Sequence, residues 1–102
     1  MLQLRPTCEH CNKKLPPEST DAMICSYECT FCSDCAQIFL ENVCPNCGGW
    51  FSLRLVRPAV NYKENNFLGH DPAVVTITYK PVDIEQHKIF SAHLKTIPPE
   101  KR

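Results

Sequence analysis

Residues 8–47 read CEHCNKKLPPESTDAMICSYECTFCSDCAQIFLENVCPNC, and they hold all eight cysteines of the 102-residue chain. The cysteines come in four close pairs, which are Cys8/Cys11, Cys25/Cys29, Cys32/Cys35 and Cys44/Cys47. This short spacing lets one tight turn present two sulfur atoms to the same metal ion. Structural zinc sites take four such ligands, so the stretch predicts two Zn²⁺ sites, each with four cysteine thiolates.

Disulfide bonds are the competing use of these cysteines, and the expected compartment argues against them. The chain opens with Met1–Pro6, MLQLRP, without an apolar signal segment, which predicts a cytoplasmic protein. Cytoplasmic thiols stay reduced, and closely spaced cysteines there are typical of metal sites. The longest apolar runs are far shorter than the ~20 residues that cross a bilayer, so we expect no membrane association.

The eight sulfurs can be shared between two metal ions in two ways. Sequential pairing, as in LIM modules, joins the first cysteine pair with the second and the third with the fourth. Interleaved pairing, as in RING cross-braces, gives site 1 the ligands Cys8, Cys11, Cys32 and Cys35 and site 2 the ligands Cys25, Cys29, Cys44 and Cys47.

Helix geometry favours the interleaved pairing. Residues Ala36–Glu41 favour a short helix, with Ser33 or Asp34 as its N-cap. Such a helix would carry the chain roughly 9 Å from Cys35, at about 1.5 Å per residue, and few residues would remain to return Cys44 to the same metal. We therefore expect a RING-like cross-brace, and the sequential arrangement stays the alternative.

Residues 1–58 are expected to form one cysteine-rich module with both zinc ions. A segment of this size rarely buries a self-sufficient apolar core, so zinc binding would supply its folding free energy. We therefore expect a small metal-stabilised α+β fold. Alternation over Trp50–Val56 predicts a closing strand, with Phe51, Leu53 and Leu55 on one face and Arg54 on the other.

Residues 59–102 are expected to form a C-terminal extension with one strand and one helix. The β-branched run Ala73–Tyr79 predicts a strand at about 73–79, and its edge could pair with a second copy to make a dimer. Asp83 can cap a helix over about 83–96, which Pro98 and Pro99 would end.

The residues around the cysteines carry a resemblance to one family. They are Leu4–Pro6, Cys8–Cys11, Leu15–Pro17, Ile24–Cys32, Val43–Gly49 and Arg57–Pro58. In these segments, residues 1–58 resemble the bacterial domain-of-unknown-function family 1272, which consists of short cysteine-rich proteins with no assigned activity. The resemblance covers a little over half of the chain. It implies a bacterial, cytosolic protein with a RING-like or treble-clef-like zinc module.

Three functions are compatible with such a module, and docking of a protein partner is the one we favour. Tyr27, Phe39 and Trp50 are candidate anchors for the partner, although in so short a chain they could instead form the small core. The alternative is a RING-type ligase for a ubiquitin-like conjugation system. Here Pro45 and Phe39 fit the RING pattern, whereas Glu9 replaces the usual aliphatic residue after the first ligand.

Nucleic-acid binding, as in many zinc ribbons, is the least favoured of the three. Residues 1–57 hold five Lys or Arg and six Asp or Glu. Two Zn²⁺ ions with eight thiolates add a charge of −4 to this balance, which gives the module a net charge of about −5. Phosphate backbones attract basic surfaces instead.

The remaining residues contain no pattern that indicates an enzyme active site. A closed site with four sulfurs leaves no position for a catalytic water. His10 lies between two ligands and is expected to act beside the site or in solvent rather than as a ligand. His70, His87 and His93 are expected at the surface. The expected role is therefore structural, without catalytic residues.

Overall fold

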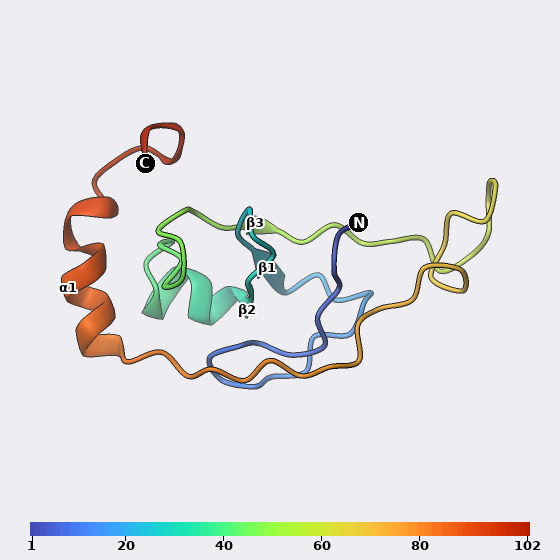
Figure 1. The fold of residues 1–102 in the computed structure, drawn as a ribbon, viewed down its shortest axis with the longest axis horizontal. Coiled ribbons are helices and arrows are strands. Elements are labelled where there is room, and N and C mark those ends of the chain that lie inside the picture. The colour runs from blue at the N-terminus through green and yellow to red at the C-terminus, as the bar shows by residue number, and fades with distance from the viewer.

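The computed structural model describes residues 1–102, and its centre is an antiparallel three-stranded sheet in the order β2-β1-β3. The strands are β1 (Ala22–Ile24), β2 (Thr30–Cys32) and β3 (Ser52–Leu53). Met23 lies opposite Phe31 on one side and Leu53 on the other. Together with helix α1, described below, this sheet makes the protein a small α+β fold, as the sequence predicted (Figure 1).

A short, wide helix, η1 (Cys35–Phe39), follows β2. The sequence predicted a helix over 36–41 with an N-cap at Ser33 or Asp34. Asp34 does precede the helix, but its side chain makes no capping hydrogen bond. The hydroxyl of Ser33 donates instead to the carboxylate of Asp21. The chain leaves the helix at Glu41, whose positive φ of 49° ends the regular backbone.

Cysteine side chains make up a large part of the hydrophobic core. It contains thirteen buried residues, which are Cys8, Leu15, Ala22, Met23, Cys25, Cys29, Phe31, Cys32, Cys35, Ala36, Leu40, Cys44 and Phe51. The rings of Phe31 and Phe51 meet edge to face with centroids 5.3 Å apart. Few aliphatic side chains take part, so packing alone gives this core little stabilisation.

The strand predicted over Trp50–Val56 is wrong in its length and in its faces. Only Ser52 and Leu53 pair with β1, and the side chains of Leu53 and Leu55 are 63% and 73% exposed. The buried neighbour is Arg54, which the sequence placed on the outer face. Its guanidinium reaches inward to backbone carbonyl groups, so Phe51 and Arg54 are buried and the predicted alternation is lost after Phe51.

Beyond the sheet the chain makes a long excursion and then returns. Residues 59–72 form a loop that projects from one end of the molecule, which measures 46 × 27 × 18 Å (Figure 1). Arg57 closes the base of this loop, because its Nη1 donates to the carbonyl of Asp71 at 2.7 Å and its Nη2 to that of Leu2 at 2.8 Å.

The predicted strand over 73–79 does not form. The segment runs beside the N-terminal residues, but only Val74 N to Leu4 O (3.1 Å) and Lys80 N to Glu9 O (2.7 Å) join the two. Pro6 in the neighbouring segment has no N–H, and its carbonyl accepts from Leu15 instead. The neighbour therefore lacks the free backbone groups that a ladder requires.

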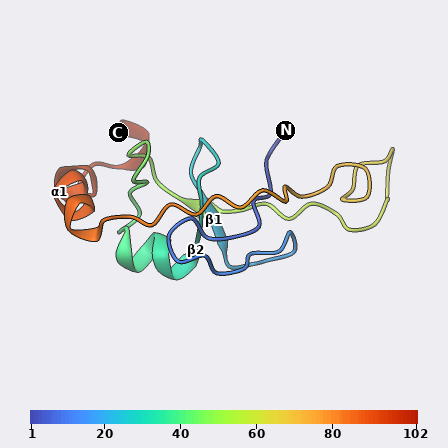
Figure 2. The same ribbon diagram turned by 60° about the horizontal axis from the view of Figure 1, so that its bottom comes forward.

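Helix α1 (Ile84–Leu94) and the short turn η2 (Pro99–Lys101) complete the chain. The helix lies within the predicted range 83–96, and Asp83 caps it by accepting a hydrogen bond from Gln86 N at 3.2 Å. His87 is buried, so its expected surface position is wrong. Figure 2 shows α1 at the end of the molecule opposite the 59–72 loop. None of the helices combines the length and the apolar character that crossing a bilayer requires.

Candidate metal centre

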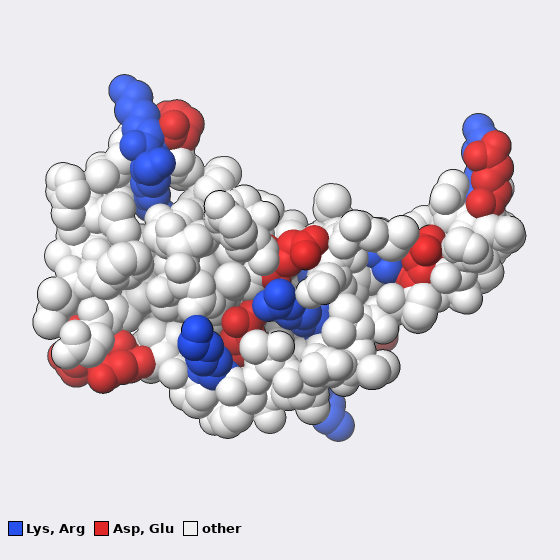
Figure 3. Space-filling view, in the orientation of Figure 1, with Lys and Arg blue, Asp and Glu red and all other residues white.

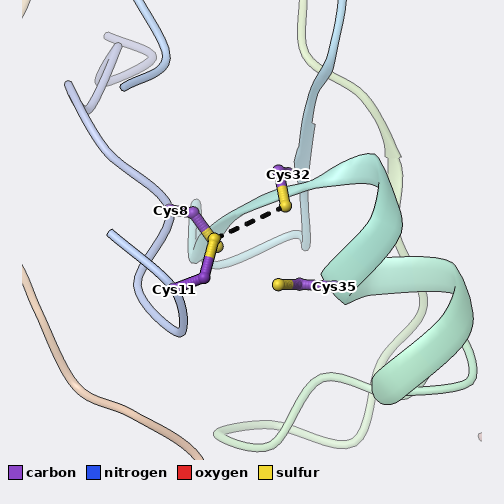
Figure 4. Close-up of side chains that lie close together, drawn as sticks. All are labelled: Cys8, Cys11, Cys32 and Cys35. Atoms are coloured by element: carbon purple, nitrogen blue, oxygen red, sulfur yellow. Dashed lines mark hydrogen bonds between the residues drawn. The ribbon is translucent and has the colours of Figure 1, made fainter. Parts of the chain in front are cut away.

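The sulfurs of four cysteines form the first group. Those of Cys8, Cys11, Cys32 and Cys35 all lie within 4.8 Å of one another, and their side chains point toward a common centre (Figure 4). The Sγ atoms of Cys11 and Cys32 are 3.8 Å apart. Four zinc–sulfur bonds of about 2.3 Å in a tetrahedron also place sulfurs about 3.8 Å apart. A disulfide would need about 2.05 Å. The group therefore has the composition and spacing of a four-coordinate metal site.

Three local structures bring these sulfurs together. Cys8 and Cys11 flank a tight turn in which Asn12 N donates to Cys8 O at 2.9 Å, and Asn12 takes a positive φ of 64°. Cys32 ends β2, and Cys35 begins η1. Asparagine adopts this left-handed backbone more readily than most residues do, which suits the turn.

Glu9 connects the Cys8–Cys11 turn, called the first turn from here on, to the sheet. The sequence did not predict this role. Its buried carboxylate accepts from Thr30 N at 2.6 Å and from Arg5 Nη1 at 3.0 Å. Its own N–H donates to Thr30 O at 3.0 Å. Burial raises the pKa of the Glu9 carboxyl, although the bond from Thr30 partly offsets this. An acidic residue between two cysteine ligands gives no sequence signal for such an inward orientation.

The second group contains three sulfurs, those of Cys25, Cys44 and Cys47, again within 4.8 Å of one another. Cys29 lies outside this limit, but the thiols of Cys44 and Cys25 are among the causes that lower its pKa. The first and third cysteine pairs thus meet in one group, and Cys25 of the second pair meets the fourth pair. Sequential pairing does not describe this grouping.

Donors surround the second group. Tyr27 N donates to Cys25 Sγ at 3.3 Å and Gly49 N donates to Cys47 Sγ at 3.4 Å. The side-chain amide of Asn46 donates to Cys29 Sγ, also at 3.4 Å. N–H groups that point at sulfur orient thiolate ligands and offset part of their negative charge.

Several thiols in the two groups have shifted pKa values. Burial raises the pKa of Cys25 to about 11 and also raises the pKa of Cys35. The neighbouring Cys29 raises the pKa of Cys44, and Cys44 in turn lowers the pKa of Cys29 to about 5. A metal cation must therefore displace protons from both groups, because only thiolates are metal ligands.

His10 belongs to neither sulfur group. Its Nδ1 accepts from Val82 N at 2.9 Å, and its ring lies 6.3 Å from that of Phe39. It thus links the first turn to the C-terminal extension. All eight cysteines are free of disulfides, and Cys11 and Cys47 are the two exposed ones.

Comparison with known proteins places the cysteine-rich part in a family. Residues 1–57 match the family described as "Protein of unknown function (DUF1272)". An uncharacterized protein of Rhizobium meliloti (strain 1021) is 58% identical over 64 residues, which cover 63% of this chain and 76% of that protein. No solved structure matches the chain.

Proposed function

This chain belongs to the DUF1272 family, and we propose that its first 57 residues form a structural module held together by two Zn²⁺ ions. The observation that supports this most strongly is the first sulfur group, with four sulfurs within 4.8 Å and one pair 3.8 Å apart. Tetrahedral sites with four sulfurs suit zinc or iron–sulfur clusters. Zinc needs no added inorganic sulfide, so it is the simpler occupant.

The proposed ligands follow the interleaved, RING-like pairing. Site 1 takes Cys8, Cys11, Cys32 and Cys35, and site 2 takes Cys25, Cys29, Cys44 and Cys47. We assign Cys29 as the fourth ligand of site 2 because Asn46, between Cys44 and Cys47, donates to its sulfur and because the thiols of Cys44 and Cys25 help to lower its pKa. With four protein ligands, each ion would have no open position for substrate or water, so its role is structural.

Native mass spectrometry of the intact chain tests the two sites. We expect two zinc ions per chain, and Cys35→Ser and Cys44→Ser should each retain one ion and lose the other. Removal of one thiolate from a closed site lowers its affinity strongly because the ligand set is no longer complete. A wild-type chain with one zinc ion, or with iron and sulfide, would contradict the assignment.

We further propose that this module docks a protein partner through its exposed aromatic side chains. Tyr27 and Trp50 are 74% and 51% exposed, whereas Phe31 and Phe51 fill the core. Tyr27, Trp50 and Cys47 line an open groove with a volume of about 530 Å³ beside the second sulfur group. Exposed aromatic residues next to a groove are typical anchors for a partner.

The charge of the module defines the chemistry of that partner. Each proposed zinc site carries two negative charges, and site 2 borders the groove through Cys25 and Cys47. Arg102 also lines the groove and offsets part of this negative charge, so a largely apolar protein segment would complement this surface. Figure 3 shows acidic and basic groups interspersed on the visible face without a continuous basic stripe, which disfavours nucleic acid.

The RING ligase alternative gains no support from the first turn. In the RING pattern the residue just after the first ligand is usually aliphatic. Here that residue is Glu9, and its carboxylate is buried against Thr30 N and Arg5. The position is therefore used for folding rather than for recruitment.

Paired aromatic variants test the docking proposal. We expect Tyr27→Ser with Trp50→Ala to abolish the retention of one defined protein partner from a cell lysate, measured by quantitative mass spectrometry. Tyr62→Ser removes an equally exposed tyrosine in the distant 59–72 loop and should leave retention unchanged. Equal retention by both variants would place the docking surface elsewhere.

A further inference from the structure

The C-terminal extension lies beyond the 1–57 family match, yet it forms hydrogen bonds and packing contacts with the loop that carries the last two cysteines. His87 Nε2 donates to the carbonyl of Val43 at 2.8 Å, directly before Cys44. Arg102 Nη1 donates to the carbonyl of Asn42 at 2.9 Å. The extension therefore holds this loop near its start, from both α1 and the C-terminal residue.

Packing secures the same loop near its end. Gly48 follows Cys47, and a Cβ atom at this position would lie 3.2 Å from a methyl carbon of Leu94 and 3.6 Å from the ring of Phe90. Both of these side chains belong to α1. The helix thus rests directly on the backbone of the turn that presents Cys47.

Asn46 connects the extension to a sulfur. Lys80 Nζ donates to Asn46 Oδ1 at 3.2 Å, and Asn46 Nδ2 donates to Cys29 Sγ at 3.4 Å. Because Lys80 is a donor only, it holds the amide oxygen toward itself and leaves the amide N–H₂ group to face the sulfur. Cys29 is the one sulfur that lies outside the second group's common 4.8 Å limit. It is therefore the sulfur that most needs an orienting partner.

We propose that Asn46 is a positioning residue for the second metal, and that the C-terminal extension acts through Lys80 and α1 to hold the Asn46 loop in place. This inference rests on the proposed zinc sites. The hydrogen bonds from the extension to the first turn are Lys80 N to Glu9 O and Val82 N to His10 Nδ1, and neither Glu9 nor His10 donates to a sulfur. Loss of these contacts should therefore affect the second site more than the first.

Metal transfer from the full-length chain to a chelator tests the proposal, with Zn²⁺ or Co²⁺ as the probe. Asn46→Asp keeps the size of the side chain and its contact with Lys80 but removes the donor to Cys29. We expect it to release one of the two ions about 10-fold faster than the wild type, in line with the loss of a partner that orients a ligand. Lys80→Met removes an exposed bond only, so its effect should be about 2- to 3-fold.

Two matched controls and one chemical readout locate the effect. Asn66→Asp and Lys63→Met change equally exposed residues of the 59–72 loop and should release both ions as the wild type does. After loss of the faster ion in Asn46→Asp, a thiol-alkylating reagent should modify Cys25, Cys29, Cys44 and Cys47. Continued protection of the four cysteines of the first group would show that the chain stays folded.

Three outcomes would overturn the proposal. Equal release from Asn46→Asp and Asn66→Asp, with two ions bound to the wild type, rejects the role of Asn46 and leaves the zinc module intact. If Cys8, Cys11, Cys32 and Cys35 were alkylated first, the labile ion would be the one in the first site, which contradicts the proposal. A wild-type chain that binds fewer than two ions rejects this inference and the proposed function together.

Discussion

At the scale of single residues, the buried charge of Arg54 holds the N-terminal segment against the sheet. The side chain is only 4% exposed. Its guanidinium donates to the carbonyls of Arg5 (2.8 Å), Leu15 (3.2 Å) and Pro16 (2.9 Å). Burial lowers the pKa of the guanidinium, but arginine stays charged at any ordinary pH. One cation binds three carbonyls. It therefore joins the segment before the Cys8–Cys11 turn to the loop after that turn.

We expect Arg54→Met to lower the free energy of unfolding of the metal-loaded chain by about 3 kcal/mol, because three buried carbonyls lose a charged donor. Chemical denaturation followed by circular dichroism measures this change. Lys14→Met removes an exposed charge and should change the free energy of unfolding by less than about 0.5 kcal/mol. A similar, small effect of both substitutions would show that Arg54 does not hold the segment.

Protonation of the sulfurs gives a second prediction at this scale. The pKa of Cys25 is raised to about 11 by burial, and that of Cys44 is raised by the neighbouring Cys29 and by burial. Both thiols are protonated at neutral pH without metal, so an ion must displace at least two protons from the second group. Metal affinity should therefore fall by at least about 100-fold for each unit of decreasing pH between about pH 6 and pH 8. Competition with a chelator across this range measures it, and a pH-independent affinity would contradict the thiolate site.

At the scale of elements, the sequence predicted those whose signals are local. The helix α1 (Ile84–Leu94) was predicted because Asp83 caps its start and Pro98 prevents its continuation. The strand over 73–79 depends on a neighbour with free backbone groups, and β-branched composition cannot report that. The face of Arg54 also escaped prediction, because its acceptors lie far away in the sequence. The dimer expected from edge pairing of this segment stays a prediction.

The distinction between local sequence signals and contacts between distant residues also applies to the metal centre. The spacing of the cysteines predicted that their sulfurs gather in groups that could hold metal ions, and the assignment of ligands to each ion stays a prediction. The roles of Glu9, Asn46 and Lys80 could not be predicted, since each acts on a residue more than a dozen positions away. Such contacts exist only once the fold has formed.

The contact between α1 and the last turn gives a prediction for this scale. Gly48 has a φ of 78°, and an added Cβ would lie 3.2 Å from Leu94. Gly48→Ala should lower the free energy of unfolding by about 1–2 kcal/mol, because a side chain is strained in this left-handed backbone. Gly49→Ala has no comparable backbone strain and serves as the matched control in thermal unfolding. Equal loss of stability in the two variants would argue against strain at Gly48.

At the scale of the whole molecule, the core has too little hydrocarbon to explain the fold by itself. Six of its thirteen buried residues are cysteines. The extension adds Val82 and Ile84 as partly buried neighbours of this core, which is a small apolar contribution. If the two proposed ions bind, they would supply much of the folding free energy, as metals do in small metal-dependent domains.

Far- and near-ultraviolet circular dichroism of the intact chain, recorded before and after treatment with a strong chelator, tests this central claim most directly. The account predicts that removal of both ions abolishes the tertiary signal of the aromatic residues and most of the ordered backbone signal, and that Zn²⁺ restores both. An unchanged, folded spectrum in the metal-free chain would contradict it.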